Sequence, residues 1–123
     1  KKKNKEETAA AIRGLYQSTG YVIDTHTAVA ASVYQKYEKD TDDDTVTVIA
    51  STASPFKFTR AVMNAIGHAD ETADDFALAD QLAQMAGLTV PDAVQSIRSA
   101  EIRHKTVCDK SEMEHAVKNF LGM

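Results

Sequence analysis

The chain has 123 residues, of which 43% are apolar and 26% are charged, and its net charge is −4. These values match globular proteins, so the chain can form one hydrophobic core and is not disordered as a whole. The acidic balance lacks the basic stripe of a nucleic-acid binder, and no apolar run approaches the roughly 20 residues that span a bilayer, so we expect neither nucleic acid nor membrane as a partner.

The cysteine content and the first residues indicate the cellular compartment of the protein and whether the sequence is part of a longer one. Cys108 is the one cysteine, so no intrachain disulfide can form, which fits a reducing compartment. No apolar stretch follows the basic first residues, so a signal peptide is not indicated and we expect a cytoplasmic protein. The sequence starts without Met. We therefore expect residues 1–123 to be a single portion of a longer protein.

The first two predicted elements are helices. Residues 5–18 form the first, and Gly20 follows it as a residue suited to the left-handed conformation after a helix end. Asp24 is expected to cap a second helix that continues to about Tyr37.

Residues 45–50 are the best strand candidate. Their sequence, Thr-Val-Thr-Val-Ile-Ala, is rich in β-branched residues, and its apolar end is typical of a strand buried on both faces. A single strand cannot satisfy its own backbone groups. It either pairs with a short extended piece at 103–107, or its neighbours lie outside this chain. An unpaired edge is also a template for a second chain, so we expect strand-mediated dimers of the fragment.

Four more helical segments follow. Ser54 and Pro55 are a capping hydroxyl and a first-turn proline, and they open the third helix. Its expected buried stripe consists of Phe58, Ala61, Val62, Ala65 and Ile66. Further helices are expected at about 73–87, from Pro91 to about Ala100, and after Ser111. Capping-box patterns introduce the first and last of these, at Thr72 with Asp75 and at Ser111 with Glu114.

The predicted fold class is therefore an α/β fragment, predominantly helical, with about six helices and one buried strand. Stand-alone chemistry is not indicated. The acidic run at 40–44 is not a calcium loop, because Thr45 and Ser51 stand where glycine and glutamate are required. The four histidines and the cysteine lack the spacing of metal ligands, and the glycines are too far apart for a phosphate loop, so no metal site is expected.

Two segments concentrate polar side chains where a ligand could bind. Residues 20–29 place several at one helix start: Asp24, Thr25, His26 and Thr27. Residues 50–58 run from the predicted strand into a helix and carry three hydroxyls, those of Ser51, Thr52 and Ser54. Ligands of open α/β sheets bind at such strand ends. The alternative is ordinary helix capping by Asp24 and Ser54, with the neighbouring side chains exposed.

Taken together, the two segments resemble threonine synthases. That family carries the pattern G-x-x-x-D-P-H-T-A-V and, some twenty-five residues on, S-T-A-x-P-x-K-F. Here the patterns read Gly20 to Val29 and Ser51 to Phe58, and the tail from His104 also resembles the family's C-terminus. Thr25 replaces the usual proline, a change that a first helical position tolerates.

The resemblance implies part of a fold-type II pyridoxal-phosphate enzyme that converts O-phosphohomoserine and water to threonine and phosphate. The cofactor of such enzymes is an electron sink. The family's Schiff-base lysine and phosphate loop lie upstream, so no catalytic residue is expected here, and Lys57 is in the wrong motif to be that lysine. The resemblance implies that Thr52 contacts the pyridine nitrogen of the cofactor. His26 is a second candidate, facing the cofactor.

The resemblance also implies partners. They are the N-terminal part of the same enzyme and the small-molecule substrate, and we expect the fragment alone to bind pyridoxal phosphate poorly and to be inactive. The alternative is an independent helical module for protein interactions, which periodic helices without a catalytic constellation also fit.

Overall fold

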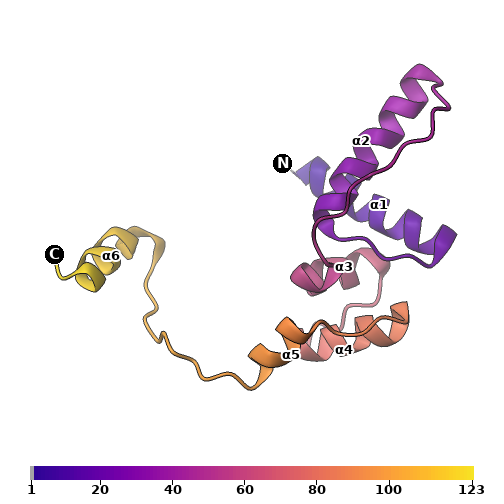
Figure 1. The fold of residues 1–123 in the computed structure, drawn as a ribbon. Helices are drawn as coiled ribbons and strands as arrows, with labels where there is room; N and C mark the ends of the chain where they lie inside the picture. The colour runs from indigo at the N-terminus through magenta and orange to yellow at the C-terminus, as the bar shows by residue number, and fades with distance from the viewer. Residues whose placement is uncertain (1) are drawn as a thin grey trace.

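Six α-helices follow one another along the chain in a computed structural model that describes residues 2–123 (Figure 1). In chain order the elements are α1 (Lys2–Thr19), α2 (Thr25–Thr41), the 3-10 helix η1 (Pro55–Phe58), α3 (Thr59–Ile66), α4 (Asp75–Ala86), α5 (Asp92–Arg98), the 3-10 helix η2 (Lys110–Glu112) and α6 (Met113–Leu121). None of the described helices is both long and apolar enough to cross a membrane.

The hydrophobic core lies mainly between the first four helices, with contributions from the segments that connect them. α1 packs against α2 and α3, and α3 packs against α4. The large side chains that are almost fully buried between them are Ile12, Val62, Met63, Leu78 and Leu82. Two arginine side chains join neighbouring helices through ion pairs. Arg60 of α3 binds Asp75 at the start of α4, and Arg98 of α5 binds both carboxylate oxygens of Asp80 in α4 at 2.8 and 3.0 Å.

Local signals located most helix ends correctly. The Asp24 and Ser54 side chains cap α2 and η1, and Gly20 adopts a φ of +74° after α1, all as predicted. The two capping boxes do not form. Asp74, not Thr72, caps α4 by accepting the Ala77 amide at 2.8 Å, and the start of α6 has no side-chain cap.

The predicted stripe of the third helix is buried only in its second half. Val62, Ala65 and Ile66 are buried, whereas Phe58 and Ala61 are exposed. The segment begins as a 3-10 helix, which has three residues per turn, so Phe58 is rotated away from the buried face that an α-helical period predicts.

The prediction of an α/β fragment is wrong, because no strand occurs in residues 2–123. Residues 45–50 have no regular structure and run back along α2 (Figure 1). Val46 and Val48 are 92% and 90% exposed, so burial on both faces is also wrong. β-branched side chains favour an extended backbone, but a strand requires a partner, and the described chain brings none to this segment. Pairing of two chains through it stays a prediction, although the strand from which it was argued is not formed.

The second predicted strand, at 103–107, is absent for the same reason. These residues are exposed, and they belong to an extended connection between α5 and α6. The two segments that were expected to pair are therefore both without regular structure.

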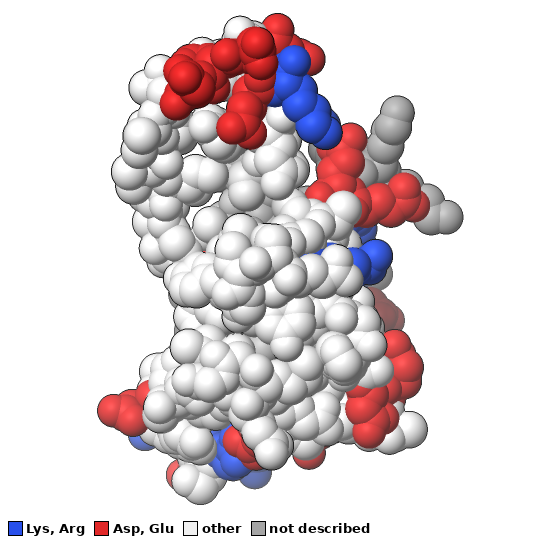
Figure 2. All heavy atoms as spheres, turned by 90° about the vertical axis from the view of Figure 1, so that its right-hand side faces the viewer, with Lys and Arg blue, Asp and Glu red and all other residues white. Residues whose placement is uncertain are grey.

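Acidic side chains gather over the C-terminal end of α2 and the turn after it (Figure 2). Asp42 adopts a left-handed conformation there, with φ at +54°, and ends the helix. Hydrogen bonds from the hydroxyls of Thr45 and Tyr37 lower the pKa of Asp43 to about 2. The acidic run thus ends α2 and continues into a segment that hydrogen bonds from Tyr37 and Thr45 hold in place.

The exposure of residues 45–50 can be tested by making the same Val→Ala substitution at a buried position and at an exposed one. Val62→Ala removes a fully buried side chain and should lower the free energy of unfolding by about 2 kcal/mol. Val48→Ala removes an exposed one and should change it by less than about 0.5 kcal/mol in urea denaturation. Equal losses would show that Val48 is buried in solution.

Candidate functional site

A buried carboxylate organises the start of α2. Asp24 is 1% exposed, and its Oδ1 accepts hydrogen bonds from the amides of His26 at 2.7 Å and Thr27 at 3.2 Å. Its Oδ2 accepts a short hydrogen bond from the Thr27 hydroxyl. The sequence places an acceptor at this helix start, where free backbone amides need one, so the cap follows from local chemistry.

These contacts also set the protonation of the carboxyl group. Burial by itself would raise the pKa of Asp24. The hydrogen bonds from the Thr27 hydroxyl and from the amides of His26 and Thr27, with a smaller contribution from the His26 ring, outweigh burial and lower the pKa below its ordinary value of 3.8. The group is therefore a carboxylate at neutral pH.

The same carboxylate holds a segment that is distant in the sequence. The Ser51 hydroxyl lies 2.9 Å from Thr27 Oγ1 and donates to Asp24 Oδ2 at 3.4 Å. This contact spans more than twenty residues and fixes the loop before η1 against the start of α2. The two sequence segments that were singled out thus meet in space.

The three hydroxyls of the loop have different fates. Ser51 is engaged by Asp24 and Thr27, and Ser54 accepts the amide of Phe56 as a helix cap. Thr52 is exposed, and its side chain forms no hydrogen bond with any residue in the range 2–123. Of the three, Thr52 is the one whose hydroxyl is available to a ligand.

His26 lies one residue from Thr27, as Thr52 lies one residue from Ser51. Because consecutive Cα atoms are about 3.8 Å apart, the Thr27–Ser51 contact brings the two predicted site residues to the same end of α2. The His26 side chain is 65% exposed, and its Nδ1 lies 3.5 Å from Asp24 Oδ1.

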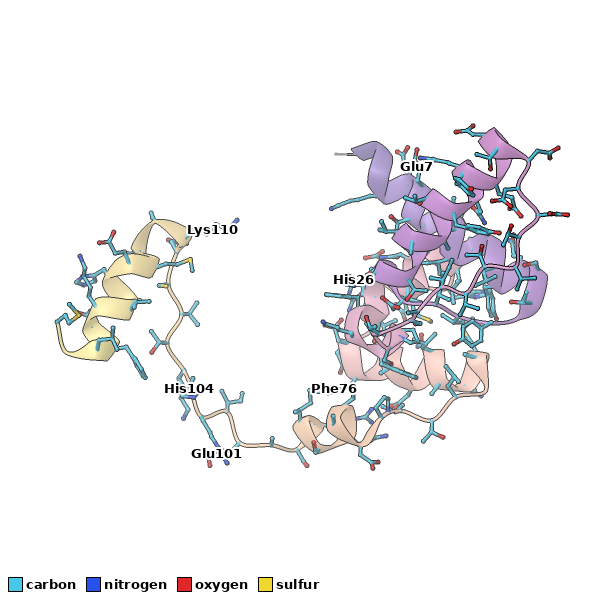
Figure 3. All side chains as sticks on the ribbon, turned by 45° about the horizontal axis from the view of Figure 1, so that its top comes forward. Glu7, His26, Phe76, Glu101, His104 and Lys110 are labelled. Carbon is cyan, nitrogen blue, oxygen red and sulfur yellow. The ribbon has the colours of Figure 1, made fainter. Side chains whose placement is uncertain are left out.

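Aromatic and apolar groups lie on one side of His26. Its ring centroid lies 5.5 Å from that of Phe58, at an interplanar angle of 35°. Beside it is an open groove of about 520 Å³, with apolar walls that include Ile12 and Val29. Lys57 is exposed, and its Nζ lies 5.6 Å from the Phe58 ring centroid. His26 itself points outward from the helical bundle, toward the side on which α6 lies (Figure 3).

The sequence did not predict the contacts that two residues make at this site. Ser51 was one of three equivalent hydroxyls, and nothing local marked it as the partner of Asp24. Phe58 was assigned to a buried stripe, and only the 3-10 turn brings its ring to His26. The described residues contain no group of three or more His, Cys, Asp and Glu side chains that could hold a metal ion.

Comparison with known families gives a specific match. The family described as "Threonine synthase, C-terminal" matches residues 27–120, which include the loop with Ser51 and Thr52 and nearly all of α6.

Individual relatives agree with this match over about half of the chain. Threonine synthase-like 1 of Mus musculus is 44% identical over 61 residues, which are 50% of this chain and 8% of the relative. Threonine synthase of Schizosaccharomyces pombe is 43% identical over 58 residues, 46% of this chain and 11% of the relative. Threonine synthase-like 1 of Homo sapiens is 40% identical over 60 residues, which are 49% of this chain and 8% of the relative. The aligned part thus spans about a tenth of the length of these relatives.

The buried carboxylate predicts a pH-dependent loss of stability. Asp24→Asn keeps one capping oxygen but replaces Oδ2, which accepts two hydroxyls, so the free energy of unfolding at pH 7 should fall by about 2 kcal/mol. Because the folded-state pKa is lowered, the carboxylate's contribution is fully present above about pH 5 and is lost as the pH falls through the folded-state value. The difference between the two proteins should therefore shrink in acid.

Asp74→Asn is the matched control for this measurement. Asp74 caps α4 through a single bond from the Ala77 amide, which an asparagine oxygen accepts equally well, so the change should stay within about 0.5 kcal/mol. A constant difference between wild type and Asp24→Asn from pH 7 to pH 3 in urea titrations would contradict a lowered pKa at Asp24.

Proposed function

The chain belongs to the threonine synthase C-terminal family, and on that premise we propose that it forms one wall of the active site of a pyridoxal-phosphate-dependent threonine synthase. That enzyme would convert O-phospho-L-homoserine and water to L-threonine and phosphate. The observation that carries the proposal is the free Thr52 hydroxyl, which the Asp24–Thr27–Ser51 contacts hold at the start of α2.

Thr52 fits the role of partner for the pyridine nitrogen of the cofactor. A hydroxyl can donate to a neutral ring nitrogen, and this one has no competing hydrogen bond with a described residue. A neutral hydroxyl does not enforce protonation of the ring as a carboxylate would. Bound pyridoxal phosphate supplies an electron sink for carbanion chemistry. The residues present therefore fit one edge of the cofactor.

Asp24 would act as a positioning residue. Its carboxylate is buried and its oxygens are occupied by amides and hydroxyls of the chain, so it is not aimed at a ligand. Its contact with Ser51 fixes the backbone next to Thr52. Errors of about 1 Å in such positions are costly, because the reacting groups must be held in alignment.

His26 would face the cofactor or substrate from the helix start. Its ring is exposed, and Phe58 on one side restricts the positions it can take. Lys57 lies beside Phe58 and is best explained as a surface lysine.

The rest of the active site would come from the N-terminal part of the same enzyme. The relatives are about ten times longer than the part that aligns with this chain, which leaves ample room for a Schiff-base lysine and a phosphate-binding loop. In this proposal the chain is one domain portion, its partners are that N-terminal part and the substrate, and neither tight cofactor binding nor turnover belongs to the chain alone.

Fragment complementation tests this division of labour. The chain alone should not release phosphate from O-phosphohomoserine when pyridoxal phosphate is added. Mixing it with the N-terminal part of the enzyme should restore phosphate release. Turnover by the isolated chain would refute the division. A stable chain with no affinity for the N-terminal part would instead favour the independent helical module.

The role of Thr52 predicts a loss of activity in the complete enzyme. Thr52→Val removes the hydroxyl at nearly constant shape and should lower kcat by roughly 10- to 100-fold, the cost of one lost hydrogen bond to the cofactor. It should also shift the absorption spectrum of the bound cofactor. Thr52→Ser, which keeps the hydroxyl, should retain most of the activity.

Thr47→Val is the control for that experiment, because it makes the same change at an exposed residue of the same segment, whose hydroxyl bonds the Thr45 carbonyl at 3.1 Å. Its kcat and spectrum should equal those of the unmodified enzyme. If Thr52→Val matched this control, Thr52 would not be the partner of the pyridine nitrogen.

A further inference from the structure

The last fifth of the chain stands apart from the helical core. Residues 99–123, here called the C-terminal arm, consist of an extended connection followed by η2 and α6 (Figure 1). Every residue of the arm is exposed except Ala116, which is half-buried. The arm thus exposes a folded helix that the core does not cover.

One face of α6 is strongly apolar. Its large side chains recur at helical spacing and include Phe120 at 82% exposure and Leu121 at 62%. Met113 and Val117 complete this face, both more than half exposed. Polar residues, among them His115 and Lys118, occupy the other side. A contiguous apolar surface of this kind marks a place where another protein surface packs.

The arm and the candidate site lie on the two sides of one open space. His26 is on the side of the core that faces the arm, and Lys110 and α6 stand opposite (Figure 3). The groove beside His26 opens next to Val29, which is 51% exposed. A body that fills the space would contact the end of α2 that carries His26 and also the arm.

We propose that the N-terminal part of the same polypeptide fills this space, and that the arm clasps it through the apolar face of α6. This inference rests on the proposed function, since that part must bring the catalytic lysine to the end of α2 that faces the arm. The relatives contain about ten times the length that aligns here, and the family match extends to Phe120. The arm is therefore shared with a family whose members carry such a body.

The small size of the α6 face favours a covalently linked occupant. A stable interface between separate proteins takes about 20 to 30 residues from each side, whereas α6 has nine residues in all. Separate partners also lose translational and rotational freedom on binding, at a cost of roughly 4–15 kcal/mol. A body in the same polypeptide avoids most of that cost, so a few apolar contacts are enough to hold the arm.

Hydrogen–deuterium exchange of α6 tests the clasp. The amides of α6 should exchange at least tenfold more slowly in the complete polypeptide than in the chain of residues 1–123. Phe120→Asp in the complete polypeptide, which puts a charge on the apolar face, should restore fast exchange. His115→Asp, which adds the same charge on the opposite face, should leave the slow exchange unchanged.

Two outcomes would overturn the clasp. Equal exchange of α6 in the complete polypeptide and in the isolated chain would show that nothing covers it. Slow exchange in the isolated chain that strengthens with concentration would show that a second copy is the occupant. Phosphate release reports separately on the proposed function: a protected α6 in an inactive polypeptide contradicts the function alone, and an unprotected α6 in an active one contradicts the clasp alone.

Discussion

The arrangement of the site depends on one buried carboxylate. Asp24 ends the turn after α1, caps α2, and holds the loop at Ser51 through a shared hydroxyl cluster with Thr27. A carboxylate is removed from water only when its oxygens are satisfied, and here amides and hydroxyls satisfy both. The described chain has no β-sheet hydrogen bonds that could fix residues 45–53, so the position of this segment depends on the Asp24 cluster.

The distribution of apolar surface divides the chain into a packed part and an unpacked part. Among the residues whose burial the structure describes, those with nearly complete burial lie between Ala11 and Val90. Val46 and Val48 and the apolar face of α6 remain in water. Contact with a larger protein, as proposed above, would bury these side chains. The proposed wall of an active site and the proposed clasp are two consequences of that single imbalance.

The proposed site depends on the position of ordinary side chains rather than on unusual chemistry. The described residues contain no group of side chains that could hold a metal ion, and the lowered pKa values of Asp24 and Asp43 arise from hydrogen bonds at a helix cap and in a turn. Ser51 and Ser54 already form hydrogen bonds within the chain, so Thr52 is the residue of this loop whose hydroxyl is available to a ligand. The most informative feature of the site is therefore which groups the fold has left unoccupied.

Local signals in the sequence determined the helices and most of their ends. Caps such as Asp24 and Ser54 act within three residues, and Gly20 follows its own conformational preference, so sequence patterns could predict them. The motifs at Gly20 to Val29 and Ser51 to Phe58 together led to the family. Tertiary structure decided the rest. It left 45–50 and 103–107 without strand partners, placed the Phe58 ring beside His26, and joined Ser51 to Asp24. Each of these outcomes depends on which groups meet across long stretches of chain, and β-propensity or capping preference does not encode that meeting.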